Sequence, residues 1–168
     1  MPVVHKKANA VANADNMPPI KNSKNIANGT LKESVGTVEV TNGDSAGSTY
    51  RLARIRSSER ISQILLSCDA ITGAAGHVGI YDINGGAAVD ADFFALAQSF
   101  VTALVNHDIT HQADPSDQGN GFGREDVEKP LWQALGLAKD PVQDYDIAVT
   151  LTAAATSAGT ISLKVRYV

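Results

Sequence analysis

The sequence has 168 residues, of which 43% are hydrophobic, and its 18 acidic and 14 basic side chains give a formal net charge of −4. This length allows one full hydrophobic core, and the acidic balance gives no support to nucleic-acid binding by neutralisation of phosphates. The single cysteine, Cys68, excludes an internal disulfide and a multi-cysteine zinc site, and no apolar run reaches the roughly 18 residues expected of a membrane span.

The first 34 residues differ from the rest of the chain. Residues 1–34 carry five lysines against two acidic residues, so this stretch has a charge of +3 and the remainder −7. The stretch also contains six asparagines and no aromatic residue. Because it has too little apolar area to offset the entropy of ordering its backbone, we predict an extended, mobile N-terminal arm over 1–34 that another chain or a neighbouring copy holds in place. The folded domain then spans 35–168.

From residue 35 onward, apolar and polar side chains alternate in short runs, the period-2 pattern of strands with one buried face. Four runs predict strands before residue 90, and they lie at 38–40, 52–55, 64–68 and 78–80. Segments rich in Gly, Ser, Asn and Asp separate them, as expected of turns.

Two later segments depart from this alternation. In 90–104, apolar residues recur every three or four positions, which predicts a helix over part of the segment, although 98–105 is equally compatible with a strand. In 127–137, Pro130 suits a helical first turn and Gly136 a helix end, which predicts about two turns. Trp132 lies in this second segment, and we expect it to close one end of the core.

The C-terminal residues give the clearest strand pattern. Residues 145–152 and 160–168 each place four apolar side chains on one face, and the small, glycine-ended connection between them predicts a hairpin. Six strands at this spacing predict an all-β, mainly antiparallel fold, namely a jelly-roll-like β-sandwich with one or two short helices and the extended N-terminal arm.

Few residues offer catalytic or metal-binding chemistry. A Cys68 nucleophile activated by His77 is one possibility, but Cys68 falls on an apolar strand face, where cysteine is usually an inert small hydrophobe. His107 and His111 are four residues apart, a spacing that would suit a metal on a helix, but their surroundings are turn-like and we interpret them as surface histidines. We therefore predict no catalytic residues, no cofactor and no metal.

The remaining polar segments are weaker candidates. The glycine-rich segment 119–123 precedes Arg124 but lacks the features of a phosphate-binding loop, so a flexible loop is expected. Five nearby acids do not match the EF-hand spacing and predict a solvated acidic rim: Asp114, Asp117, Glu125, Asp126 and Glu128. Four other carboxylates border turns and are expected to cap backbone amides: Asp69, Asp82, Asp90 and Asp92.

The body of the chain has one basic concentration, formed by Arg51, Arg54, Arg56 and Arg60. Strand alternation predicts that Arg54 and Arg56 project to one face and Arg51 to the other, so the four do not form a single stripe. Contact with an acidic partner surface and a plain solvated edge both remain open.

Three segments, 48–95, 129–137 and 144–168, resemble a family of small virion proteins of tailed bacteriophages, the capsid decoration or cement proteins encoded beside the major capsid protein. The quoted motifs include STYRLARIRSSERISQILLSCDAITG, KPLWQALGL and TISLKVRYV. The similarity covers most of 35–168 and consists of a pattern of strands and turns. For residues 1–34 it is limited to the general character of the segment.

The resemblance implies a jelly-roll-like domain on the capsid exterior of the virion that bridges neighbouring major capsid proteins, with neighbouring copies in a dimer or trimer as further partners. It implies a mechanical role and no enzyme activity. Two alternatives stay open, a carbohydrate- or receptor-binding module on the virion and a head–tail connector component, since jelly rolls serve many functions.

Overall fold

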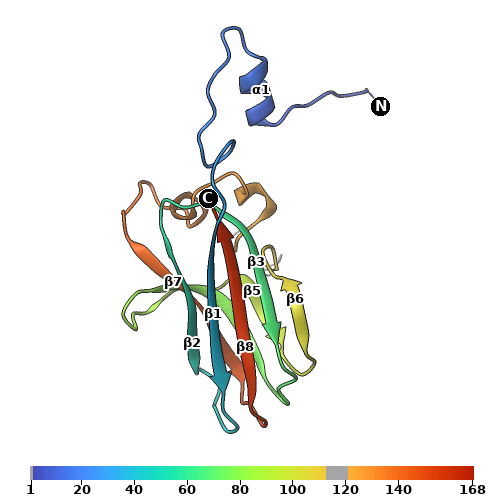
Figure 1. The fold of residues 1–168 in the computed structure, drawn as a ribbon, viewed down its shortest axis with the longest axis vertical. Helices are drawn as coiled ribbons and strands as arrows, with labels where there is room; N and C mark the ends of the chain where they lie inside the picture. The colour runs from blue at the N-terminus through green and yellow to red at the C-terminus, as the bar shows by residue number, and fades with distance from the viewer. Residues whose placement is uncertain (1, 113–120) are drawn as a thin grey trace.

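The computed structural model describes residues 2–112 and 121–168, and two four-stranded antiparallel sheets packed face to face form its core (Figure 1). The strands are β1 (Lys32–Val40), β2 (Thr49–Arg56), β3 (Ile61–Cys68), β4 (Ala75–Asp82), β5 (Ala88–Ser99), β6 (Leu104–Asp108), β7 (Asp144–Ala153) and β8 (Gly159–Tyr167). The sheet orders are β1-β8-β3-β6 and β2-β7-β4-β5. This is the strand order of an eight-stranded jelly roll, so the predicted all-β sandwich is confirmed.

The inner faces of both sheets supply one continuous core. The alternation read in the last strand is confirmed, because Ile161, Leu163 and Val165 are fully buried and the residues between them are partly exposed. Phe93, Phe94 and Phe122 add an aromatic cluster with ring centroids 5.1 to 6.0 Å apart. The sandwich is therefore stabilised by apolar burial, as expected from the strand patterns.

The predicted hairpin between 145–152 and 160–168 is wrong. Strand β7 pairs with β2 and β4, whereas β8 pairs with β1 and β3 in the other sheet. The connection 154–158 crosses from one layer to the other, so the apolar faces of the two strands meet across the core. Alternation correctly identified the buried face of each strand but carries no information about which strand lies beside it.

The helix predicted within 90–104 is also wrong, because this region forms β5 and the start of β6. The pairing of β5 with β4 shifts register three times, and Ala97 has a φ of 46°. These irregularities break the alternation, so the adjacent residues Phe93 and Phe94 are both buried. An irregular strand thus imitates the apolar spacing of a helix.

The second predicted helix is shorter than expected. Helix α2 (Leu131–Ala134) is a single turn that starts after Pro130 and ends before Gly136, whose φ is 71°. A 3₁₀ turn, η1 (Arg124–Asp126), precedes it. Leu131, and not Trp132, enters the core, since Trp132 is only half-buried.

The remaining helix, α1 (Asn9–Asp15), lies in the N-terminal segment. Strand β1 begins at Lys32, which pairs with Tyr167, so the last three residues of the stretch predicted as arm belong to a sheet. None of the helices in the described ranges is long and apolar enough to cross a membrane.

Candidate functional site

The N-terminal arm, taken from here on as residues 2–31, leaves the sandwich at the end where the chain also terminates and projects away from it (Figure 1). Its root is bonded to the domain, because Asn25 Nδ2 donates to the Ser58 carbonyl oxygen at 3.2 Å and Arg60 Nε donates to the Asn25 carbonyl oxygen. Beyond the root, residues 2–22 form hydrogen bonds only with other arm residues in the described part of the chain. One of these bonds joins Asn13 Nδ2 to Asn22 Oδ1 at 2.8 Å. The arm is held at its root and extends away from its own domain.

The arm exposes most of its large apolar side chains. Helix α1 buries no residue. Two of the most exposed apolar side chains in the described residues are Met17 at 94% and Val3 at 84%. The full set in the arm is Val3, Val4, Val11, Met17, Ile20, Ile26 and Leu31. Several large apolar side chains exposed to solvent on one segment are typical of segments that bind another molecule.

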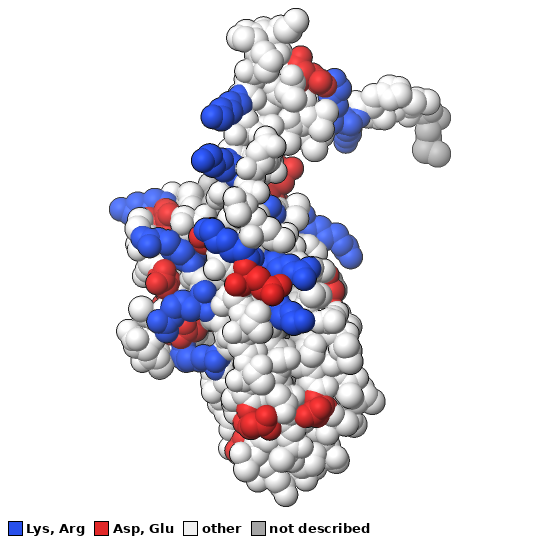
Figure 2. Space-filling model, in the orientation of Figure 1, with Lys and Arg blue, Asp and Glu red and all other residues white. Residues whose placement is uncertain are grey.

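Charge is distributed unevenly along the molecule. On the face shown in Figure 2, Lys and Arg lie over the arm and the adjoining part of the sandwich, while only acidic side chains are coloured at the far tip. The connections at that tip, 41–48, 69–74, 100–103 and 154–158, contain no Lys or Arg. The basic side chains therefore lie toward the arm-bearing end, where acidic side chains are mixed with them, and the arm itself, with four lysines and one aspartate, has a net charge of +3, which suits an acidic partner surface.

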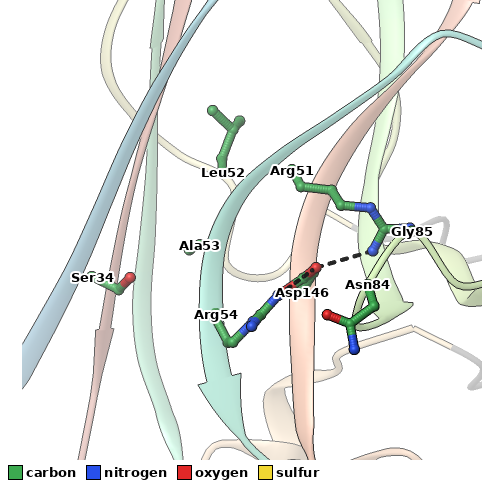
Figure 3. Close-up of a pocket in the computed structure, with 8 residues that line it drawn as sticks. All are labelled: Ser34, Arg51, Leu52, Ala53, Arg54, Asn84, Gly85 and Asp146. Atoms are coloured by element: carbon green, nitrogen blue, oxygen red, sulfur yellow. Dashed lines mark hydrogen bonds and ion pairs between the residues drawn. The ribbon is translucent and has the colours of Figure 1, made fainter.

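The basic concentration on β2 is arranged differently from the prediction. A β-bulge between Arg51 and Ala53 breaks the alternation, so Arg51 and Arg54 both reach the carboxylate of Asp146 (Figure 3). The nitrogen–oxygen distances are 3.1 Å from Arg51 Nη1 and 2.7 Å from Arg54 Nε. Arg60 is separate from this cluster and bonds the arm root instead. The expectation that Arg51 faces away from Arg54 is wrong.

Asp146 is the residue at this site that sequence reasoning missed. Burial alone would raise the pKa of its carboxyl, but the hydrogen bonds from Arg54 and Arg51 outweigh burial and hold the pKa below its ordinary value. The side chain is only 6% exposed. An aspartate on the polar face of a strand is predicted to be exposed. The structure instead places Asp146 opposite Arg54 in the pairing of β2 with β7, where the two side chains can form an ion pair.

Cys68 and His77, which we considered as a nucleophile and base and set aside, do not come together. Cys68 lies on β3 in one sheet and His77 on β4 in the other. Cys68 is buried, burial raises the pKa of its thiol, and its sulfur lies 4.0 Å from the Thr102 carbonyl oxygen. The Nδ1 atom of His77 accepts a hydrogen bond from the Ala97 amide at 3.1 Å. Cys68 and His77 therefore make separate contacts and do not form a nucleophile–base pair.

His107 and His111 make separate contacts. The ring of His111 stacks on Phe122 with centroids 5.3 Å apart, while the Nε2 atom of His107 lies 3.1 Å from the Gln112 side-chain nitrogen. Across residues 2–112 and 121–168, no group of three or more His, Cys, Asp or Glu side chains is placed to hold a metal ion.

The glycine-rich and acidic segments lie partly outside the described residues, including Asp114 and Asp117. Of the glycine-rich segment, Phe122 is buried in the core, and its amide donates to the Phe93 carbonyl oxygen at 2.7 Å. Asp126 is buried and not part of a solvated rim, since it accepts from the Gly123 amide at 2.9 Å and from Lys129 Nζ at 2.7 Å. The predicted amide-capping role is confirmed for two of the turn carboxylates, Asp69 and Asp90.

Aromatic side chains do not form an outward-facing platform. All nine aromatic residues lie in the described part of the chain, and each is buried or half-buried. Proteins that bind glycans or other rings by stacking use exposed aromatic faces. This arrangement gives no support to the carbohydrate-binding alternative.

One tyrosine at the far tip predicts a measurable pH dependence. Burial, followed by the 2.5 Å hydrogen bond from Tyr50 Oη to Asp44, raises the pKa of Tyr50 to about 12 from its ordinary value of 10.0. The folded protein therefore holds this proton more tightly than the unfolded chain, so the stabilisation is complete below pH 10 and is lost as the pH rises toward 12.

The measurement is urea unfolding at several pH values between 9 and 12. Tyr50→Phe is expected to remove part of the fall in unfolding free energy over this range, while the lysines, which titrate in both proteins, cancel in the comparison. If the unfolding free energy falls equally with pH in Tyr50→Phe and in the unaltered protein, Tyr50 does not contribute to the pH dependence.

Comparisons of the sequence and the structure with known proteins identify no family for this chain. No family model matches the sequence, and no curated protein matches it significantly. Among solved structures, the chain is similar to the cyanophage Pam1 capsid asymmetric unit, with 10% sequence identity and a TM-score of 0.48 over 82% of this chain and 84% of that chain. A TM-score of this size establishes neither a common fold nor a common function.

Proposed function

We propose that this protein is a structural component of a phage virion that binds the outside of the capsid and bridges neighbouring major capsid proteins. The observation that carries the proposal is the arm, which is bonded to its own domain at its root and leaves seven large apolar side chains exposed. A segment that buries so little against its own domain gains its contacts when it orders on another surface.

The dimensions of the arm suit bridging. Residues 2–22 can extend to about 70 Å, while a strand of nine residues spans about 30 Å. An arm of this reach can contact a subunit beyond the one on which the sandwich sits. Many modest contacts then act together, because the shell supplies neighbours at fixed spacing. The net positive charge of the arm favours an acidic exterior.

The resemblance of 48–95, 129–137 and 144–168 to capsid decoration proteins favours this role over a receptor-binding module or a connector. The role is mechanical and requires no reacting group. A rigid jelly roll supplies contact area, and the arm supplies reach. Contacts between neighbouring copies belong to the same proposal.

The test adds the purified full-length chain to empty shells assembled from the major capsid protein of the same phage. We expect saturable co-sedimentation at a fixed ratio of chain to capsid protein, and a higher temperature of shell rupture at saturation. An unrelated acidic protein of similar size serves as the control. Failure to co-sediment, or an unchanged rupture temperature at saturation, would contradict the proposal.

A further inference from the structure

The Arg51–Asp146–Arg54 cluster forms the wall of an open pocket of about 490 Å³. Strand β1 contributes Ser34, and the turn after β4 contributes Asn84 and Gly85. Figure 3 shows Arg51 and Arg54 reaching Asp146 from two sides, with Asn84 beside them. The pocket thus combines two guanidinium groups and an amide around a single buried carboxylate.

Arg51 and Arg54 have different hydrogen-bond partners. Arg51 donates to the carbonyl oxygens of Asp82 at 2.6 Å and Gly86 at 2.7 Å, so it fixes the turn between β4 and β5 as well as pairing with Asp146. Arg54 donates only to Asp146, through Nε at 2.7 Å and Nη2 at 3.3 Å. Its Nη1 makes no hydrogen bond within the described residues, and its side chain is 52% exposed.

The charges of the wall do not balance. Asp146 supplies one negative charge against the two positive charges of the arginines, so the lining has a surplus of +1. The acid that acts on Arg54 from beyond the lining is Asp144, which lies opposite Arg56 in the register of β2 and β7. Arg54 is therefore a half-exposed cation that shares its nearest carboxylate, Asp146, with a second arginine.

We propose that this pocket binds a carboxylate, and that an acidic side chain of an adjoining protein subunit supplies it. The planar guanidinium of Arg54 has donors left to pair with a second carboxylate, and the surplus of one charge suits a monoanion. The Ser34 hydroxyl and the Asn84 amide line the same pocket and can act as neutral donors. The choice of a subunit rests on the proposed function, because β1 continues the arm and contributes Ser34 to the pocket lining, so a partner bound along the arm can reach the pocket.

The first experiment tests the pocket on the isolated full-length protein. Sodium glutarate is titrated against a ¹⁵N-labelled sample, with sodium chloride of equal ionic strength as the reference, and the Arg54 side-chain Nε–Hε and Gly85 amide signals are followed by NMR. We expect saturable shifts, a dissociation constant about tenfold weaker in Arg54→Gln, and no change in Arg56→Gln. The amide spectrum of each variant reports that it is folded. Equal shifts in sodium chloride, or equal affinity in Arg54→Gln, would overturn the pocket.

The second experiment tests the source of the carboxylate on shells. We expect Arg54→Gln to need a several-fold higher concentration than the unaltered protein for half-saturation, with Arg56→Gln unchanged. If Arg54→Gln binds shells as well as the unaltered protein does, the carboxylate does not come from the shell and the subunit assignment is overturned. Failure of the unaltered protein to bind shells would overturn the proposed function and the subunit assignment, while the glutarate result would still decide the pocket.

Discussion

Deletion of residues 2–22 is expected to leave the sandwich folded and to abolish its retention on capsid shells. These residues are not hydrogen-bonded to the sandwich in the described structure, and helix α1 buries none of its side chains. The unfolding free energy should therefore change by less than about 0.5 kcal/mol. Loss of the tether removes the multivalent part of binding, so apparent affinity for shells should fall by about 100-fold or more.

The deletion has to end before the root, because Asn25 is bonded to the domain and β1 begins at Lys32. The matched variant keeps the full arm but replaces Lys6, Lys21 and Lys24 with glutamine. It should bind shells more weakly than the unaltered protein, with a smaller salt dependence, since only the charge contribution is removed. Full retention of the truncated chain on shells would refute the role of the arm.

Replacement of Gly36 by alanine is expected to destabilise the sandwich by about 2–4 kcal/mol. Gly36 lies in β1, where that strand passes β2 of the other sheet. A Cβ atom at Gly36 would lie 1.8 Å from the Leu52 carbonyl oxygen and 2.6 Å from the Leu52 carbonyl carbon. Both are backbone atoms, so no side-chain rotation relieves the overlap and the two strands must separate.

Urea unfolding measures this effect, with Thr37→Ala as the control at the next position of the same strand. Thr37 is exposed, so its replacement should cost less than about 1 kcal/mol. Equal stability of Gly36→Ala and the unaltered protein would show that β1 and β2 do not approach so closely.

The sequence predicted the regular strands well and the irregular ones poorly. In β8, the alternation ending at Val165 identifies the buried face directly, because a straight strand has period two. In β5, the left-handed backbone at Ala97 and the register shifts against β4 remove that period. Pairing across the jelly roll also lies beyond local patterns, since β7 and β8 are consecutive in the chain yet belong to different sheets.

The same limit applies to the candidate site. The N-terminal segment stood out through its charge and its composition, which are local properties. The cluster around Asp146 did not, because it depends on a bulge at Arg51 and on the turn at Gly86, which is 35 residues from Arg51 in the chain. A carboxylate on the polar face of a strand is predicted to be solvated, and only the folded chain places two arginines over it.

The number of copies in each particle tests the central claim most directly. Quantitative mass spectrometry of purified virions, with the major capsid protein as the internal standard, gives the ratio of the two chains. Decoration of the shell predicts hundreds of copies in each particle, in fixed proportion to the capsid protein. A dozen copies or fewer would indicate a connector at a single vertex and would contradict a role in bridging capsid proteins across the shell.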